Sequence, residues 1–268
     1  STEDFPPGLN DLMQGVGGTL NMNWWFANKA IILDTAGRIF EEKVKAGQSN
    51  EWLEFLKMLK RTRKNMPING FILTIPADSL IRDPVNEIEQ KASHIAEQLT
   101  VVQNTLGVRF PVFVLISKAD FIPGFREFVE NLNEPRLQHQ MLGWSNPKNL
   151  DEPFVPEQVE SYLSDVIEKL KKRRLTYMLD PHPQHGGKRL DDLDALFTFP
   201  NHLKSAVPNL RRYLEIVFSL NPWSDKPLFI RGIYFTSSLQ RGEALDQAIA
   251  SVMGKDLDDM ALSSFKKE

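Results

Sequence analysis

Several features that are common in secreted, membrane and nucleic-acid-binding proteins are missing from the 268-residue sequence. It has no cysteine, which excludes a disulfide framework, a thiolate zinc site and a cysteine nucleophile. No apolar run approaches the roughly 18 residues of a membrane-spanning helix. The 32 basic and 35 acidic residues leave a formal net charge of −3, so no general attraction to nucleic acid is expected.

What remains is the composition of a globular protein. Hydrophobic residues make up 41% of the chain and charged residues 25%, and a chain of this length buries a full core without disulfide or metal support. It begins at Ser1 without the pattern of a signal peptide and ends at Glu268. We expect it to be a piece of a longer protein.

Strands and helices are predicted to alternate along much of the chain. Four almost continuously apolar runs are typical of parallel strands covered on both faces: 30–33, 69–75, 110–116 and 228–235. Helical spacing predicts helices over about 50–63, 85–106 and 242–253. In the longest of these, Asp83 is expected at the N-cap and Gly107 just past the last turn. This alternation predicts a doubly wound α/β sheet.

Residues 135–222 interrupt the alternation. They contain no convincing buried strand, and apolar residues at helical spacing recur over 159–170 and 203–217. Residue types that favour turns cluster at 146–151 and 181–188, and these stretches are expected to be more mobile than the sheet. We therefore predict an α/β part over 1–134, a helical insertion without sheet strands over 135–222, and a last strand and helix over 223–268.

Two short motifs follow predicted strands. Asp34-Thr35-Ala36-Gly37 has the D-x-x-G form that nucleotide switches use on the Mg²⁺ and γ-phosphate side. Ser117-Lys118-Ala119-Asp120 has the form of the guanine-reading [NT]-K-x-D element, in which the acceptor-only carboxylate takes two N–H bonds from the base. Each motif alone is also typical of a strand-end turn or a helix N-cap. Their order, each at the carboxyl end of a strand, favours a GTPase-like fold.

Longer blocks of sequence show a more specific resemblance. Gly15-Val16-Gly17-Gly18-Thr19 precedes Asn23-Trp24-Trp25-Phe26, and the segments 115–125 (LISKADFIPGF) and 231–242 (RGIYFTSSLQRG) follow in order. Together they resemble the cytoplasmic domain of the IcmF/TssM family, the large inner-membrane subunit of type VI secretion systems. The resemblance covers nearly the whole chain and is weakest across 135–222.

The resemblance implies a GTPase-like (P-loop NTPase-type) domain, with a mostly parallel sheet and a helical insertion. Thr19 would match the Mg²⁺-side switch threonine, and Asp34 with Gly37 the γ-phosphate sensor. Lys118 and Asp120 would match the base reader, and Ser237 would lie in the loop beneath the guanine.

The chain lacks residues with which a working GTPase binds the phosphates and positions the attacking water. It contains no G-x-x-x-x-G-K-[ST] motif, which forms the main cradle of the β- and γ-phosphates, and Arg38 stands where Ras-type enzymes have the water-orienting Gln. We therefore expect no catalytic residues, no metal and no cofactor in this chain. GTP or ATP with Mg²⁺ would require a P-loop supplied from elsewhere.

The leading interpretation is a structural and interaction domain that helps to anchor the secretion apparatus at the cytoplasmic face of the bacterial inner membrane. The resemblance implies a TssL/DotU-type inner-membrane protein and baseplate components as partners. It implies the lipoprotein TssJ as a further partner, through a periplasmic part outside this chain, and no nucleic acid. The alternative is a switch that binds and hydrolyses GTP or ATP to gate or power assembly.

The missing P-loop also affects the expected sheet. In GTPase-like folds, the strand that leads into the P-loop lies between the strands that here are 30–34 and 69–75. Without that strand, unpaired backbone groups would remain in the middle of the sheet. We expect the two flanking strands to pair directly or to be bridged by another segment of the chain.

Overall fold

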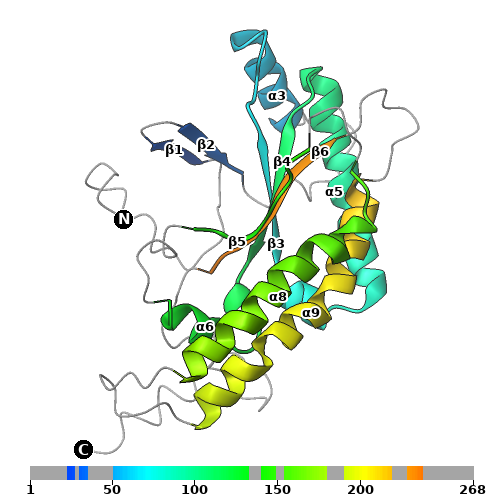
Figure 1. Cartoon of the computed structure of the whole chain (residues 1–268). Coiled ribbons are helices and arrows are strands. Elements are labelled where there is room, and N and C mark those ends of the chain that lie inside the picture. The colour runs from blue at the N-terminus through cyan, green and yellow to red at the C-terminus, as the bar shows by residue number, and fades with distance from the viewer. Residues whose placement is uncertain are drawn as a thin grey trace, which may run out of the picture.

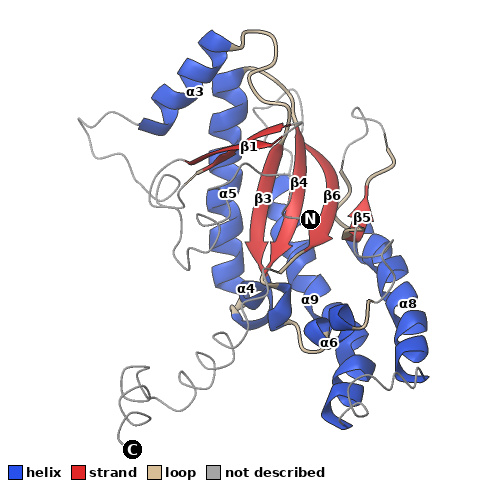
Figure 2. Ribbon diagram, turned by 90° about the vertical axis from the view of Figure 1, so that its left-hand side faces the viewer, coloured by secondary structure: helices blue, strands red, loops and turns tan. Residues whose placement is uncertain are grey.

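The computed structural model describes residues 23–27, 30–35, 51–132, 140–148, 154–179, 190–218 and 228–237. Within these ranges the chain has a mixed α/β fold with a mostly parallel sheet (Figures 1 and 2). The sheet has the strand order β3-β4-β6-β5. Its parallel strands are β3 (Phe71–Pro76), β4 (Pro111–Ser117) and β6 (Phe229–Phe235).

Helices α5 (Val85–Leu106) and α9 (Leu190–Phe218) lie on one face of this sheet, and α8 (Gln158–Leu179) packs along α9 (Figures 1 and 2). The strand residues that point toward these helices form the core, and in β4 they are Val112, Val114 and Ile116. Shorter helical elements join the layers: α3 (Glu51–Thr62), α4 (Ala77–Arg82), the 3₁₀ turn η2 (Ala119–Phe121) and α6 (Phe125–Glu130).

The boundaries of α5 agree with the sequence prediction, except at the N-cap. Gly107 ends the helix in the left-handed conformation (φ 69°), as the pattern predicts. Asp83 is not the N-cap, however, because Pro84 takes that position. Asp83 instead ends α4, a helix that follows β3 directly and that periodicity did not reveal because it has only six residues.

The prediction that no sheet strand comes from 135–222 is wrong. Strand β5 (Leu142–Ser145) pairs antiparallel with β6 at the edge of the main sheet. With four residues and a glycine, it is too short to show an apolar pattern. Gly143 permits the close pairing, because a Cβ there would lie 2.1 Å from the carbonyl oxygen of Ile233. Trp144 stacks on Tyr162 of α8 (4.0 Å between centroids, 8° between planes).

The predicted helical character of this span is confirmed by α8 and α9. Asn146, expected at the start of a mobile stretch, is buried, and its amide donates to the carbonyl of Ile230 on β6 (2.9 Å). Residues 149–153 and 180–189 lie outside the described residues, as does the helix predicted over 242–253. The domain boundaries at 134/135 and 222/223 stay a prediction.

Direct pairing of the strand at 30–34 with the strand at 69–75 is also wrong, while bridging by a segment outside the described residues stays a prediction. β2 (Ala30–Asp34) pairs antiparallel with β1 (Asn23–Ala27) in a separate two-stranded sheet. Only two residues separate the strands, and such a short connection favours local antiparallel pairing over pairing with a distant strand. Within the described part of the chain, β2 and β3 neither pair nor are bridged by a third strand.

Candidate functional site

The carboxyl ends of β3, β4 and β6 bring three loop segments together at one edge of the sheet. Ligands of open parallel sheets bind in the crevice outside this edge. Two of the loops are joined through their backbones. The N–H of Ala119 donates to the carbonyl of Thr236 (3.0 Å), and the N–H of Thr236 donates to that of Ile116 (2.9 Å). The segments that follow β4 and β6 are therefore held side by side.

Asp120 and Ser237, both predicted from the sequence, are in contact at this edge. The Ser237 hydroxyl donates a hydrogen bond to Oδ1 of Asp120. An ionised carboxylate has about four acceptor positions, so Asp120 retains capacity to accept N–H groups of a ligand. The structure places the two residues together, and their role toward a nucleotide stays a prediction.

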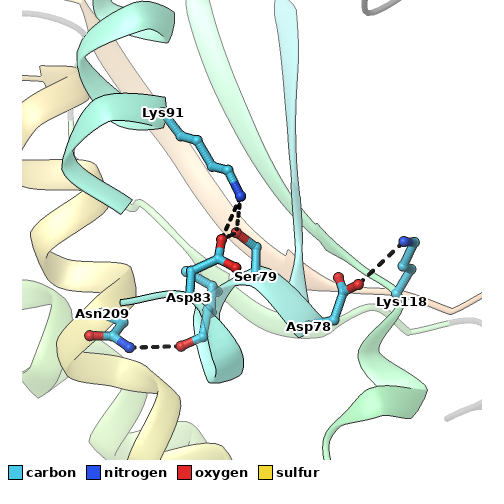
Figure 3. Close-up of polar contacts among 7 residues, drawn as sticks. Asp78, Ser79, Asp83, Lys91, Lys118 and Asn209 are labelled. Carbon is cyan, nitrogen blue, oxygen red and sulfur yellow. Dashed lines mark hydrogen bonds and ion pairs between the residues drawn. The ribbon is translucent and has the colours of Figure 1, made fainter. Parts of the chain in front are cut away.

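Lys118 reaches the same edge in an unusual backbone conformation. It has φ 52° and ψ 39°, and it is the sole non-glycine residue with positive φ in the described ranges. For a residue with a Cβ this conformation costs roughly 1–2 kcal/mol, and such residues cluster at functional sites. Its Nζ lies 3.4 Å from Oδ2 of Asp78 (Figure 3). The same Nζ lies 6.0 Å from the centre of the Phe121 ring.

Asp78 is a site residue that the sequence analysis missed. It lies in the first turn of α4, directly after β3, so it faces the segment that follows β4. Its Oδ2 pairs with Lys118, and its Oδ1 is buried with no hydrogen-bond partner in the described structure. The signal that could have found it is a carboxylate just past a strand end, the same position that singled out Asp34 and Asp120.

The structure does not bring Asp34 to the Lys118–Asp120 edge. Asp34 ends β2 in the other sheet, and with Thr35 it lines a cavity of about 780 Å³ that also contacts β3 and α5. Tyr213 of α9 lines the same cavity, and burial raises the pKa of its hydroxyl to about 12. Thr19 and Gly37 lie outside the described residues. Of the three residues predicted to contact Mg²⁺ and the γ-phosphate, Asp34 alone therefore lies in the described part of the chain.

A second polar cluster holds α4 against its neighbours (Figure 3). Nζ of Lys91 on α5 lies 2.5 Å from Oδ2 of Asp83 and 3.3 Å from the Ser79 hydroxyl, which itself donates to Asp83. From the other side, the Asn209 amide on α9 donates to the carbonyl of Leu80 (2.8 Å). The contacts connect α4 to α5 and α9 and so hold Asp78 in position.

The Lys91–Asp83 pair gives a pH-dependent prediction. Hydrogen bonds from Lys91 and then Ser79 hold the pKa of Asp83 below its usual range. A depressed folded-state pKa contributes stability above the unfolded pKa near 4, and this contribution is lost as the pH falls through the lower folded value. Lys91→Met should therefore lower the free energy of unfolding by about 1 kcal/mol or less at pH 7 and by less at pH 3.

Urea unfolding at the two pH values measures this difference. The control is the same substitution in the Asp83→Asn background, measured as the difference between Asp83→Asn and the double variant Asp83→Asn/Lys91→Met. Without the carboxylate, the cost of Lys91→Met should be independent of pH. An equal cost of Lys91→Met at pH 7 and pH 3 in the wild-type background would contradict the assignment.

The strand ends offer polar groups that can bind a ligand. Asp120 offers a carboxylate, Ser237 a hydroxyl and Lys118 a cation that is engaged by Asp78. Nowhere in the described residues do three or more His, Asp or Glu side chains gather as they would to hold a metal ion. The Lys118–Asp78 pair, both members of which are partly exposed, contributes little to stability, about 1 kcal/mol or less.

The sequence model of the family described as "IcmF-related N-terminal domain" matches residues 45–264. The chain belongs to the IcmF-related family. The earlier resemblance to the IcmF/TssM family is thereby confirmed. The IcmF-related match includes every described element from α3 to β6, whereas β1 and β2 precede it.

A curated relative of this IcmF-related chain is the "Type VI secretion system component TssM1" of Pseudomonas aeruginosa. The two are 34% identical over 242 residues, which is 90% of this chain and 21% of the relative. The chain thus spans about a fifth of the relative's length. No solved structure matches the chain significantly. Of the helices in the described ranges, none combines the length and hydropathy needed to cross a bilayer.

Proposed function

We propose that this chain is a structural and interaction domain of a TssM-like component of a type VI secretion membrane complex. The observation that supports the proposal is the 34% identity to the Pseudomonas aeruginosa component, which extends over 90% of this chain. In this proposal the domain lies at the cytoplasmic face of the inner membrane and helps to anchor the secretion apparatus. Its partners are a TssL/DotU-type membrane protein and baseplate components, with TssJ bound by a periplasmic part.

We further propose that the domain has a GTPase-like fold without nucleotide function. The proposal rests on three observations. The sequence contains no P-loop motif. Asp34 ends a strand of the two-stranded sheet, whereas Lys118 and Asp120 follow β4 of the main sheet. The residue expected at the γ-phosphate and the residues expected at the base therefore belong to different sheets. The ammonium group of Lys118 forms an ion pair with Asp78, so its side chain is not positioned to cover a base. No cofactor is expected in this chain.

The rival switch function is favoured by one observation, the contact between Asp120 and Ser237 at the strand ends. A substitution that changes only base recognition separates the two functions. In Asp120→Asn, the carboxamide oxygen can still accept the Ser237 hydroxyl. The amide NH₂ would face the N–H edge of a guanine, and donors opposite donors abolish recognition.

The test uses the chromosomal gene in the bacterium that encodes the chain. One strain has an in-frame deletion of residues 51–237, another has Asp120→Asn, and immunoblots confirm equal protein levels. We expect type VI secretion to be lost in the deletion strain and to stay within about twofold of wild type with Asp120→Asn. Normal secretion after the deletion would refute a structural role. If secretion is lost with Asp120→Asn although the protein still folds, the nucleotide switch is supported and the purely structural role is refuted.

A further inference from the structure

Helix α3 ends in a cluster of cations, here called the α3 basic end. It comprises the five Lys and Arg side chains of residues 57–64, all of which are exposed: Lys57, Lys60, Arg61, Arg63 and Lys64. The apolar face of the same helix is buried and contains Trp52, Leu56 and Leu59. The helix is therefore amphipathic, packed on the core through its apolar face, with its cations at the surface.

The positive charge of the α3 basic end is largely uncompensated. Among the described residues, its one ion pair joins Lys57 to Glu54 (2.8 Å), and the charge of Arg61 also acts on that carboxylate. Lys60 contacts a neutral acceptor instead, the carbonyl of Thr105 in the last turn of α5 (2.9 Å). One carboxylate therefore faces five cations.

The segments around the α3 basic end add no negative charge. Residues 65–76 lead into β3 and form it, residues 98–111 end α5 and lead into β4, and neither segment contains Asp or Glu. Asp34 of the neighbouring hairpin lies in the cavity of about 780 Å³ beside Lys91, and no residue of α3 lines that cavity. The end of α3 is thus a locally basic surface on a chain whose formal net charge is −3.

An exposed methionine accompanies the cations. Met66 is 53% exposed in the turn between α3 and β3. Asn69 connects it to Arg63, because the Asn69 amide donates to Sδ of Met66 (2.9 Å) and its oxygen accepts from the Arg63 guanidinium (3.3 Å). Helix α3 lies at the opposite end of the molecule from α4 and α6 (Figures 1 and 2). An apolar side chain and a group of cations therefore share one protruding end.

We propose that the α3 basic end docks on an anionic phospholipid bilayer, with its cations beside the headgroups and Met66 at the boundary with the acyl chains. Clusters of four or more Lys and Arg side chains on an amphipathic helix bind anionic headgroups, and each cation strengthens binding by about fivefold. The flexible apolar side chain of methionine adds contact with the acyl chains. The proposal rests on the proposed function, which places this domain at the inner membrane, and it identifies the surface that faces the bilayer.

The shape and composition of the α3 basic end favour a bilayer over a nucleic acid. A nucleic acid is bound by a stripe of cations that follows its phosphates, and it offers no apolar contact to Met66. The cluster here is confined to a helix end and the turn after it. A protruding end with an apolar side chain among cations suits a flat surface that is anionic outside and apolar beneath.

The absence of native cysteine permits a test with single fluorescent reporters. Met66→Cys carries an environment-sensitive fluorophore at the α3 basic end. Val85→Cys is the matched control, because Val85 is similarly exposed (56% against 53%) but lies in the first turn of α5, whereas Lys60 contacts its last turn. Both positions are exposed, so both variants should fold, as circular dichroism can verify.

The probe is a set of vesicles with equal parts of phosphatidylglycerol and phosphatidylcholine, compared with vesicles of phosphatidylcholine alone. With the anionic vesicles, we expect the emission of the Met66→Cys reporter to shift to the blue and to be quenched by nitroxide-labelled lipids. The Val85→Cys reporter should change in neither respect. Vesicles of phosphatidylcholine alone should leave both reporters unchanged, and high salt should release the chain from the anionic vesicles.

The cations are tested by vesicle sedimentation with two double variants that change the net charge equally. Arg61→Glu/Lys64→Glu should weaken binding to the anionic vesicles by about twenty-fivefold, fivefold for each cation. Arg61 donates only to a carbonyl of its own helix, so the substitution breaks no contact between elements. Lys169→Glu/Lys172→Glu on α8 reverses two exposed charges at another surface and should leave binding within about twofold of wild type.

Four results would overturn the proposal. Equal binding to vesicles with and without phosphatidylglycerol would show that anionic headgroups are not recognised. An equal loss of binding in the α8 variant would show that net charge alone acts. An unchanged Met66→Cys reporter on bound chain would place the contact on another surface. Binding of duplex DNA or polyglutamate as tight as that of the anionic vesicles, at equal charge concentration, would make the cluster a general polyanion site.

Failure of this proposal and failure of the proposed function give different results. If the chain does not bind anionic vesicles but secretion is lost after deletion of residues 51–237, the lipid contact is refuted and the structural role stands. If the chain binds the vesicles through the α3 basic end but secretion is normal after the deletion, the structural role is refuted and the lipid contact is confirmed.

Discussion

Replacing Phe199 by alanine is expected to lower the free energy of unfolding by about 4 kcal/mol. Phe199 is fully buried on α9, and its ring lies 5.9 Å from that of Phe125 and 5.2 Å from that of Phe128, both on α6. Phe128 in turn lies 5.2 Å from Tyr177 of α8. The truncation leaves a cavity where three helices meet, and close-packed aromatic rings cannot collapse to fill it.

The matched control for this prediction is Phe197→Ala, two residues earlier in α9. Phe197 is 45% exposed, and its main partner is the Arg174 guanidinium, 4.3 Å from the ring centre. Its loss should cost about 1 kcal/mol. Urea unfolding followed by tryptophan fluorescence measures both variants. Equal costs for the two substitutions would show that the α6–α8–α9 junction is not packed as described.

Gly124→Ala should have the second-largest effect, a loss of about 3 kcal/mol. Gly124 is the N-cap of α6 and has φ 86°, a conformation that residues with a Cβ rarely adopt. A Cβ there would lie 2.2 Å from the carbonyl oxygen of Ala195 and 2.7 Å from Cβ of Phe199. Backbone atoms of α9 cannot move aside, so α6 would have to separate from α9.

Gly107→Ala measures the cost of a left-handed backbone conformation without a steric clash against the backbone. Gly107 also has positive φ (69°), but its added Cβ would approach only the flexible end of Lys60, 3.1 Å away. This variant should lose about 1 kcal/mol, the cost of the left-handed conformation alone. If Gly124→Ala loses no more than Gly107→Ala in the same urea titration, α6 does not approach α9 as closely as the structure indicates.

Much of the fold could be predicted from the sequence, because three parallel strands and α5 give strong periodic signals. The runs at 69–75, 110–116 and 228–235 correspond to β3, β4 and β6 within two residues at each end. The partner of β2 could not be predicted in the same way. Apolar content marks a strand but not its neighbour, and the antiparallel pairing with β1 depends on a two-residue connection.

The candidate site was predicted only where residues follow the strands directly. Lys118, Asp120 and Ser237 lie just past β4 and β6, and parallel strands bring such residues to one edge. Asp78 follows β3 just as closely and carries the same strand-end signal, which the sequence analysis did not use. Lys91 could not be predicted, because its place beside Asp83 depends on a contact between α5 and α4 that has no sequence pattern. Tertiary packing, rather than local sequence, selects these partners.

In the proposed function, this chain acts by binding other proteins and not by binding nucleotide. Most affinity for a triphosphate comes from the backbone amides and lysine of a P-loop, and the sequence contains no such motif. Base contacts from Asp120 alone would leave affinity at the millimolar level, about −4 kcal/mol. Lys118 contributes less to a base while it is engaged by Asp78.

The most direct measurement is a titration of the 268-residue chain with fluorescent GTP and ATP in the presence of Mg²⁺, followed by an assay for phosphate release. We predict no saturable binding at micromolar nucleotide and no turnover above the buffer blank. Micromolar binding of GTP that Asp120→Ala abolishes would contradict the account and establish the nucleotide switch in its place.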